Sequence, residues 1–122
     1  LDAQPGMLAL ATKRLQRRSL RNFTPVSGLA EKLPFEAGQF DTVLMVTVLG
    51  ETTDRRQSVL EAARVLKPGG VFSVTEAAGD PDHVRRADLD RLALAAGMDR
   101  AAAWNGLLVK TFNYRRPAGP PA

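Results

Sequence analysis

The sequence predicts an α/β fold in three layers, in which helices cover a mostly parallel sheet that ends in an antiparallel hairpin. One observation is a strand-like run at residues 40–49, a helical pattern at 54–67 and a second strand-like run at 71–75. A strand, a helix and a strand of these lengths form one right-handed crossover between parallel strands. The other observation is Asn105-Gly106 between two further strand-like runs, which is the strongest short signal for a hairpin.

The composition is that of a single soluble globular domain. The chain has 122 residues, of which 44% are hydrophobic and 25% are charged. No apolar stretch approaches the roughly 18 residues that a membrane span needs, and no signal peptide opens the chain, so we expect a cytoplasmic location. The sequence has no cysteine and one histidine. This excludes disulfides, a thiolate nucleophile and a multi-histidine centre, and we expect no metal.

The net charge of +4 raises the question of nucleic-acid binding. The basic residues gather at 13–21, 55–56 and 85–86. Few aromatic residues lie among them, although stacking on a single strand requires aromatic side chains. We therefore interpret these clusters as solvated helix surfaces and expect no nucleic-acid partner.

The strand–helix–strand unit is the part around which the rest of the chain is placed. The run at 43–46 is apolar at successive positions, which predicts a strand buried on both faces. Asp54 is the expected N-cap of the helix, with Gln57 where a capping box places it. The apolar face of the helix consists of Val59, Leu60, Ala63 and Leu66. Pro68 ends the helix, and the glycines at 69–70 give a left-handed exit.

The residues before this unit predict one helix and one edge strand. The chain opens with the end of a strand, followed by a helix that has Pro5 in its first turn. Residues 20–26 predict a short strand, and Pro25 places it at a sheet edge because proline cannot donate to a ladder. The loop that follows contains an apolar clip at 33–35, which we expect to pack on the edge of the sheet.

The residues after the unit predict a helix and the closing hairpin. The helix covers about 84–96, and the hairpin arms are residues 98–104 and 107–113. The arms flank the Asn-Gly turn. The domain therefore covers 1–115, and the proline-rich residues 116–122 form a tail that we expect to be disordered.

Four short motifs lie in an order and at spacings typical of one enzyme family. They are residues 2–8, 30–35, 40–41 and 64–70. Through them the chain resembles the class I S-adenosylmethionine-dependent methyltransferases (methyltransferase type 11), especially those related to the ubiquinone and menaquinone C-methyltransferases. The resemblance implies an incomplete part of a Rossmann-like sheet, with the hairpin as its last two strands. It also implies S-adenosylmethionine as the cofactor, bound across the carboxyl ends of the strands.

The resemblance assigns residues to the cofactor site. They are Asp2, Ala3, Met7, Leu29, Ala30, Val46 and Thr47. Asp2 matches the acidic residue that binds both ribose hydroxyls, since a carboxylate accepts two hydrogen bonds. The other interpretation of Asp2 is a simple acid at a helix N-terminus. Ala3 and Met7 would pack near the adenine ring.

Two positions depart from the family pattern. Leu29 and Val46 stand where relatives have polar residues, so neither can form the hydrogen bond found there. The backbone amide of Ala30 and the side chain of Thr47 are the groups left for this purpose. For Leu29 and Val46 we expect ordinary packing in the core.

The glycine-rich turn that forms the family's first motif is not found in this sequence, and the chain begins with Leu1 instead of Met. We therefore expect a truncated domain, the C-terminal portion of a longer methyltransferase. In the family order the absent strands lie beside the strand at 40–49, so we expect an unpaired edge there. The alternative is that the short chain is the natural protein and forms a homodimer through this edge.

Methyl transfer from a sulfonium needs in-line attack and exclusion of water more than acid or base groups. His83 is the candidate for a general base, and its alternative role is a surface residue at a helix start. Glu51 and Glu76 could face the substrate, although each also fits a solvated acid in a loop. Asp41 opens its strand at the amino end, and we interpret it as structural.

The sequence thus predicts an S-adenosylmethionine-dependent methyltransferase of a small molecule, a transferase that would be inactive without its N-terminal part. The alternative is a catalytically inert, methyltransferase-like interaction module that pairs through its open sheet edge. A dinucleotide-dependent oxidoreductase is a further candidate function, which the fold alone supports. The methyl acceptor does not follow from the sequence, because variable loops shape substrate pockets.

Overall fold

The computed structural model describes residues 1–119. The helices are α1 (Pro5–Arg17), the 3₁₀ helix η1 (Leu49–Glu51), α2 (Arg55–Val65) and α3 (Arg86–Ala95), and the strands are β1 (Phe40–Val46), β2 (Leu66–Ala77), β3 (Asp99–Asn105) and β4 (Val109–Arg115). No helix in this part of the chain is long and apolar enough to cross a bilayer.

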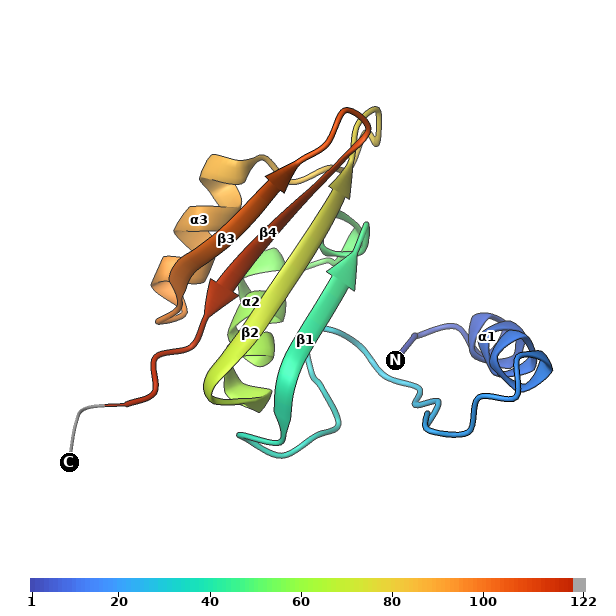
Figure 1. The fold of residues 1–122 in the computed structure, drawn as a ribbon. Coiled ribbons are helices and arrows are strands. Elements are labelled where there is room, and N and C mark those ends of the chain that lie inside the picture. The colour runs from blue at the N-terminus through green and yellow to red at the C-terminus, as the bar shows by residue number, and fades with distance from the viewer. Residues whose placement is uncertain (120–122) are drawn as a thin grey trace.

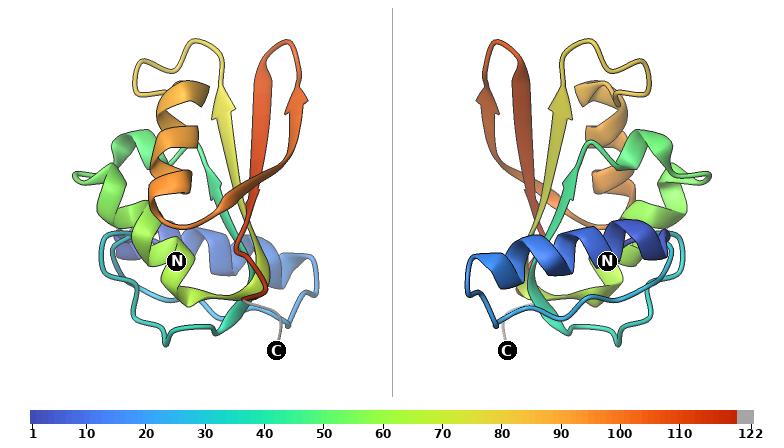
Figure 2. Two further views of the ribbon diagram at one scale, coloured as in Figure 1. Left: turned by 90° about the vertical axis from the view of Figure 1, so that its left-hand side faces the viewer. Right: turned by 90° about the vertical axis from the view of Figure 1, so that its right-hand side faces the viewer.

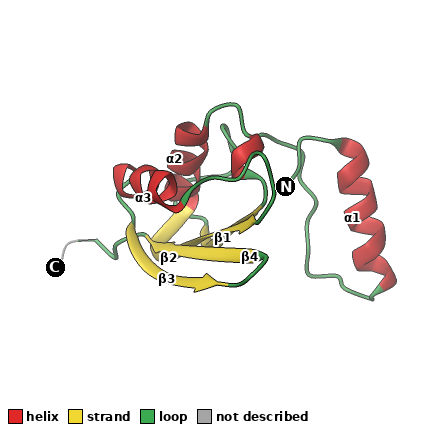
Figure 3. Cartoon of the chain, turned by 90° about the horizontal axis from the view of Figure 1, so that it is seen from above, coloured by secondary structure: helices red, strands yellow, loops and turns green. Residues whose placement is uncertain are grey.

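The strands form one mixed sheet in the order β1-β2-β4-β3. β1 and β2 are parallel, and β4 is antiparallel to both β2 and β3. Helices α2 and α3 cover the same face of the sheet (Figures 1 and 3), and Figure 2 shows both helices stacked against it from the side. The α/β crossover and the closing hairpin are therefore confirmed, and within this sheet parallel pairing is confined to the pair β1–β2.

The two helices and the sheet enclose one hydrophobic core. Its largest fully buried side chains include Leu49, Val59, Val65, Leu66, Phe72, Val74, Leu89, Met98 and Tyr114. Alternate residues of β2 are buried, as the period of two requires for a strand with one covered face. The apolar faces predicted for the helices are confirmed at Val59 and Ala63 of α2 and at Leu89 and Ala93 of α3, whereas Leu66 is buried as the first residue of β2.

β1 lies at the edge of the sheet, and its outer side has no partner strand among residues 1–119. The unpaired edge that we expected is therefore confirmed. The prediction of burial on both faces is wrong, because Met45 is buried while Leu44 is 68% exposed. The helices cover one face of the sheet only, so alternate side chains of β1 meet solvent (Figure 3).

Asp54 caps α2 as predicted. Its Oδ1 accepts a hydrogen bond of 3.0 Å from the backbone N–H of Gln57. The helix ends before the predicted proline, because Leu66 already pairs with Phe40 across the sheet. Gly69 has the expected left-handed backbone, with a φ of +82°, but it lies inside β2 and not in a loop.

The strand predicted at 20–26 does not form. The chain makes a single parallel bridge here, between Asp2 and Ser27. Pro25 has no N–H to donate, and the backbone hydrogen bonds of this stretch go to Leu15 at the end of α1 and to Asp2, not to a neighbouring strand of the sheet. The helix before it, α1, has no buried residue and lies apart from the sheet (Figures 1 and 3).

The hairpin forms where we predicted it, with a longer loop. Asn105 belongs to β3 and pairs with Lys110 of β4, so the predicted two-residue turn is wrong. The longer loop reaches the end of β2, because the N–H of Ala78 donates to the carbonyl of Leu108 over 2.7 Å. This hydrogen bond holds the hairpin tip beside β2. It joins residues far apart in the sequence, so local turn preferences do not predict it.

Arg116 continues the ordered part of the chain beyond the predicted domain end. Its backbone exchanges hydrogen bonds with Gly69 and Gly70, and its side chain donates to the carbonyl of Leu66. These contacts anchor Arg116 to β2. Residues 120–122 lie outside the described residues, and disorder stays a prediction there.

Candidate functional site

The loops that follow β1 and β2 lie together at the carboxyl ends of these parallel strands. Arg55 joins them, because its Nη2 donates to the carbonyls of Gly50 (3.2 Å) and Asp82 (3.4 Å). Gly50 is required at this crossing, since a Cβ atom there would lie 1.6 Å from the carbonyl oxygen of Asp82. Ligands of open α/β sheets bind outside the carboxyl ends of the strands, so this end of the sheet is the candidate functional face.

A short parallel pairing holds Asp2 beside Ser27. The N–H of Asp2 donates to the carbonyl of Val26 over 3.1 Å, and the N–H of Gly28 donates to the carbonyl of Asp2 over 3.2 Å. The side chain of Asp2 is partly exposed, and its Oδ1 accepts a hydrogen bond of 2.8 Å from the N–H of Gln4. The carboxylate therefore keeps acceptor positions for a ligand.

An apolar cavity of about 330 Å³ runs along the unpaired edge of β1. Its walls include Leu1, Val26 and Ala30 of the N-terminal segment, and Val43, Met45 and Val48 of β1 and the loop after it. The volume is that of a small-molecule site. Because apolar side chains dominate its lining, the cavity suits a flat apolar group better than a charged one.

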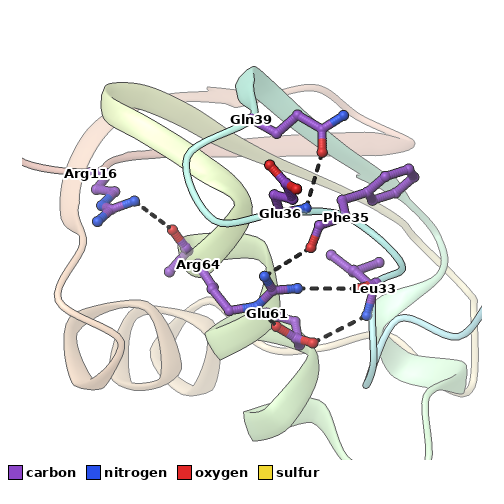
Figure 4. Close-up of polar contacts among 8 residues, drawn as sticks. Leu33, Phe35, Glu36, Gln39, Glu61, Arg64 and Arg116 are labelled. Atoms are coloured by element: carbon purple, nitrogen blue, oxygen red, sulfur yellow. Dashed lines mark hydrogen bonds and ion pairs between the residues drawn. The ribbon is translucent and has the colours of Figure 1, made fainter.

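Glu61 and Arg64 of α2 form a clamp that fixes the apolar clip at one wall of this cavity (Figure 4). Arg64 contacts the Glu61 carboxylate and donates to the carbonyls of Phe35 (2.9 Å) and Leu33 (3.1 Å). Glu61 in turn accepts a hydrogen bond of 3.2 Å from the N–H of Leu33. The ring of Phe35 packs edge-on against Phe40, with centroids 4.9 Å apart. The predicted packing of this clip on the sheet edge is therefore confirmed.

Thr47 follows the last residue of β1 in the left-handed region, with a φ of 52°. A β-branched residue rarely takes this conformation, which costs about 1–3 kcal/mol. The N–H of Thr47 donates to the carbonyl of Thr75 over 2.8 Å, and its hydroxyl donates to the carbonyl of Val46, also over 2.8 Å. Strain of this kind is concentrated at functional sites, which supports a role for the carboxyl end of β1.

The remaining predicted cofactor residues lie on the surface. Leu29 and Val46 are each 57% exposed, so the expectation that they pack in the core is wrong. Leu29 lies at a turn, and Val46 lies on the uncovered face of the sheet. Ala3, before α1, and Met7, in its first turn, are also exposed, and neither lines the cavity along β1.

His83 and Glu76 border a second cavity, of about 350 Å³, at the carboxyl end of β2. His83 is exposed, and its Nδ1 lies 2.9 Å from the carbonyl oxygen of Asp80. Glu76 is not the solvated loop acid that its position suggested, because it belongs to β2 and is 6% exposed. Burial raises the pKa of the Glu76 carboxyl, while a hydrogen bond from the N–H of Val84 opposes this shift. Had the predicted strand been extended beyond Thr75, its alternation of buried and exposed residues would have predicted that Glu76 is buried.

Two further acidic residues take the places expected of them. Glu51 is exposed in η1, after the carboxyl end of β1. Asp41 lies at the amino end of the sheet, where its Oδ1 is 3.4 Å from Nζ of Lys67. Asp41 thus lies at the opposite end of β1 from the candidate functional face, which agrees with a structural role.

Comparison with known proteins shows that the chain is similar to methyltransferases. The family model described as a methyltransferase domain matches residues 1–74. The chain is 41% identical over 78 residues to an uncharacterised methyltransferase, sll0829, of Synechocystis sp., which covers 62% of this chain and 34% of that protein. It is 39% identical over 77 residues to the ubiquinone/menaquinone biosynthesis C-methyltransferase UbiE of Bartonella quintana, which covers 62% and 30%. The chain thus spans about a third of the length of these curated relatives.

Solved structures share the fold over nearly all of this chain. A SAM-dependent methyltransferase from Aquifex aeolicus gives a TM-score of 0.82 at 16% identity, covering 93% of this chain and 65% of that chain. The [4+2]-cyclase SpnF gives a TM-score of 0.80 at 20% identity, covering 96% and 64%. Identities this low establish the fold alone. The predicted Rossmann-like fold is confirmed.

Proposed function

This chain belongs to the methyltransferase domain family, and from that premise we propose that it is part of an S-adenosylmethionine-dependent methyltransferase acting on a small molecule. S-adenosylmethionine is the cofactor that this membership implies. The observation that carries the proposal is the pairing of Asp2 with Ser27, which fixes a partly exposed carboxylate at the residue that follows Leu1, a wall residue of the apolar cavity along β1.

The residues present fit one side of such a cofactor. Asp2 has acceptor positions left for two adjacent ribose hydroxyls. The apolar cavity suits a flat heterocyclic ring, and Ala30 forms part of its wall. Leu29 offers no polar group to that ring, so recognition of its edge would fall to the backbone around Ala30.

When bound, the cofactor supplies a methyl group on a positively charged sulfur. The chain's own part is to orient the reactants and to exclude water. In this proposal Asp2 fixes the ribose, and Val46 and Thr47 border the site at the end of β1. Ala3, before α1, and Met7, in its first turn, approach the adenine from outside the cavity.

His83 is proposed as a general base for acceptors that must lose a proton. A carbonyl oxygen only accepts hydrogen bonds, so Nδ1 of His83 carries the proton that it donates to Asp80. This assignment leaves Nε2 of the neutral imidazole as the proton acceptor. The side chain is exposed, so Nε2 is accessible to a substrate at this end of the sheet.

The open edge of β1 further supports the proposal that these 122 residues alone bind the cofactor weakly and lack activity. A further parallel strand beside β1 would close the apolar cavity and complete the site. The test is a chimera in which the residues preceding the matched region of the Synechocystis relative are joined to this chain. Titration calorimetry with S-adenosylmethionine should show binding by the chimera and little or none by the 122-residue chain.

Variants of the chimera test the residue roles. Asp2→Asn should weaken binding by about tenfold or more, because a charge-assisted pair of hydrogen bonds is lost. Asp80→Asn, an equal change in the loop after β2, should leave the affinity unchanged. Equal affinities of the two variants would remove Asp2 from the site. A folded chimera that binds no cofactor, or tight binding by the 122-residue chain, would contradict the proposal.

The second candidate is a catalytically inert interaction module that forms a homodimer through β1. The observation in its favour is the unpaired edge with exposed Leu44 and Val46 on the adjoining face. Sedimentation equilibrium of the 122-residue chain tests it. A dimer should be lost in Leu44→Lys and retained in Leu94→Lys, which places the same charge on α3, and a monomeric parent chain would exclude this candidate.

A further inference from the structure

The cavity of about 350 Å³ at the carboxyl end of β2 is large enough for a small molecule of its own. It lies between the loop that joins β2 to α3 and the β3–β4 hairpin. Glu76 of β2 forms its acidic side, and Leu107, Leu108 and Phe112 of the hairpin form its apolar side.

Glu76 is a buried carboxylate with one unsatisfied oxygen. The residue is 6% exposed, and its Oε2 accepts a hydrogen bond of 3.3 Å from the N–H of Val84. Its Oε1 is buried and has no hydrogen-bond partner among residues 1–119. A buried acceptor without a donor is costly, and an ammonium group is the strongest donor because its hydrogen bond to a carboxylate is charge-assisted. The cavity therefore favours a ligand that brings an ammonium group.

Two cationic side chains that line the same cavity are available to form an ion pair with an acidic group of a ligand. Arg85 and Lys110 are exposed, and neither forms an ion pair in the described part of the chain. Lys110 is the direct cross-strand neighbour of Glu76 in the pairing of β2 with β4. An anionic position and a cationic position thus lie side by side on one wall.

The hairpin side of the cavity includes apolar surface that residues 1–119 leave exposed. Leu107 is 93% exposed and Leu108 is 71% exposed, although both line the cavity. The ring of Phe112 lies beside them, and Arg86 is held over that ring at 5.3 Å from its centroid. Covering exposed leucine side chains with an apolar group is favourable, so the ligand has an apolar portion.

We propose that this cavity binds a zwitterionic amino acid with an apolar side chain. The ammonium group donates to Oε1 of Glu76, and the carboxylate pairs with Lys110 and Arg85. The side chain covers Leu107 and Leu108. This inference goes beyond the proposed function, because it requires no cofactor. The further step of taking the amino acid as the methyl acceptor rests on the proposed function, and the binding experiment does not depend on it.

The test is an NMR titration of the isotope-labelled 122-residue chain, without cofactor, by three probes. L-phenylalanine has both charged groups, phenethylamine lacks the carboxylate and 3-phenylpropionate lacks the ammonium group. We expect L-phenylalanine to bind about tenfold more tightly than 3-phenylpropionate and about threefold more tightly than phenethylamine. The amide shifts should be confined to residues 76–86 and 107–112.

Two variants assign the charged groups. Glu76→Gln keeps the side-chain shape and should weaken L-phenylalanine binding about tenfold, whereas Glu51→Gln, the same change in η1, should leave it unchanged. Lys110→Met should weaken L-phenylalanine alone and leave phenethylamine unchanged, and it tests the proposal even if the Glu76 variant fails to fold. Equal binding of L-phenylalanine and 3-phenylpropionate, shifts elsewhere in the chain, or no binding of any probe at millimolar concentration would overturn the proposal.

Discussion

Replacing Tyr114 by Phe tests how much one buried hydrogen bond between α3 and β4 contributes to stability. Tyr114 is 1% exposed, and its hydroxyl donates over 2.6 Å to Oδ1 of Asp90, which is also buried. Asp90 keeps its ion pairs with Arg86 and Arg100 through the other carboxylate oxygen. The change therefore removes one donor from a buried carboxylate and leaves the ring in the core.

The expected cost follows from the charge of the acceptor. A hydrogen bond to a charged group contributes about 1.5–3 kcal/mol, and the two cations partly compensate Asp90, so we expect a loss of about 2 kcal/mol in the free energy of unfolding. Thr111→Val is the matched control. It removes a hydroxyl from the same strand, but the bond to Thr75 (2.9 Å) is neutral and partly buried. The control should cost less than about 1 kcal/mol.

The same residue predicts a dependence on alkaline pH. Burial, and then the hydrogen bond to Asp90, raise the pKa of the Tyr114 phenol above its ordinary value. The folded state therefore keeps a proton that the unfolded state releases above about pH 10. The stability contributed by Tyr114 is present below that pH and falls as the pH rises through it. In Tyr114→Phe this part of the alkaline loss should be absent.

Urea unfolding followed by circular dichroism measures these differences. A double-mutant cycle with Asp90→Asn should give a coupling free energy of about 1 kcal/mol between the two side chains. The reasoning is refuted if Tyr114→Phe costs no more than Thr111→Val, or if the coupling is within error of zero. Parallel loss of alkaline stability in parent and variant would refute the assignment of the raised pKa.

Two further predictions concern the clamp and the buried acid. Arg64→Met should speed amide hydrogen exchange at Leu33 by about tenfold, because two carbonyls of the clip lose their donor, and unchanged exchange would contradict the clamp. Arg91→Met, which removes a surface pair with Asp88, is its control. Glu76→Gln should gain stability over the parent chain as the pH rises from about 4 towards neutral. Burial raises the pKa of Glu76, so the parent chain loses the stability that the protonated carboxyl contributes as the pH rises above the ordinary value of about 4. Parallel urea midpoints across that pH interval would show that burial does not disfavour the ionised carboxylate.

Signals that depend on a few neighbouring residues were predicted correctly from the sequence. Asp54 caps α2 through Gln57, three residues later, which is a strictly local hydrogen bond. Pro5 lies in the first turn of α1, where a missing N–H leaves no intrahelical hydrogen bond unmade. Such features require no knowledge of the tertiary fold.

Signals that depend on tertiary neighbours were predicted less well. An apolar run such as 43–46 is the same in a central strand and in an edge strand, so burial on both faces did not follow from it. The segment at 20–26 has strand propensity but no ladder to join. The sequence assigned Glu76 to a loop, because the apolar run ends at Thr75. In the structure β2 continues past Thr75, since pairing with β4 extends the strand to Ala77.

The shared fold does not decide the chemistry, because the same sheet occurs in a protein named as a [4+2]-cyclase and in one named as a methyltransferase. The discriminating groups must therefore be side chains at the carboxyl ends of the strands. At the end of β1 this chain has a strained Thr47 beside an apolar Val46, and at the end of β2 it has the unsatisfied Glu76. Both departures cost stability without a ligand, since strain and an unpaired buried acceptor are each unfavourable. A ligand that donates to Glu76 would recover the second cost, so thermal stabilisation by bound molecules is a direct way to identify ligands of this face.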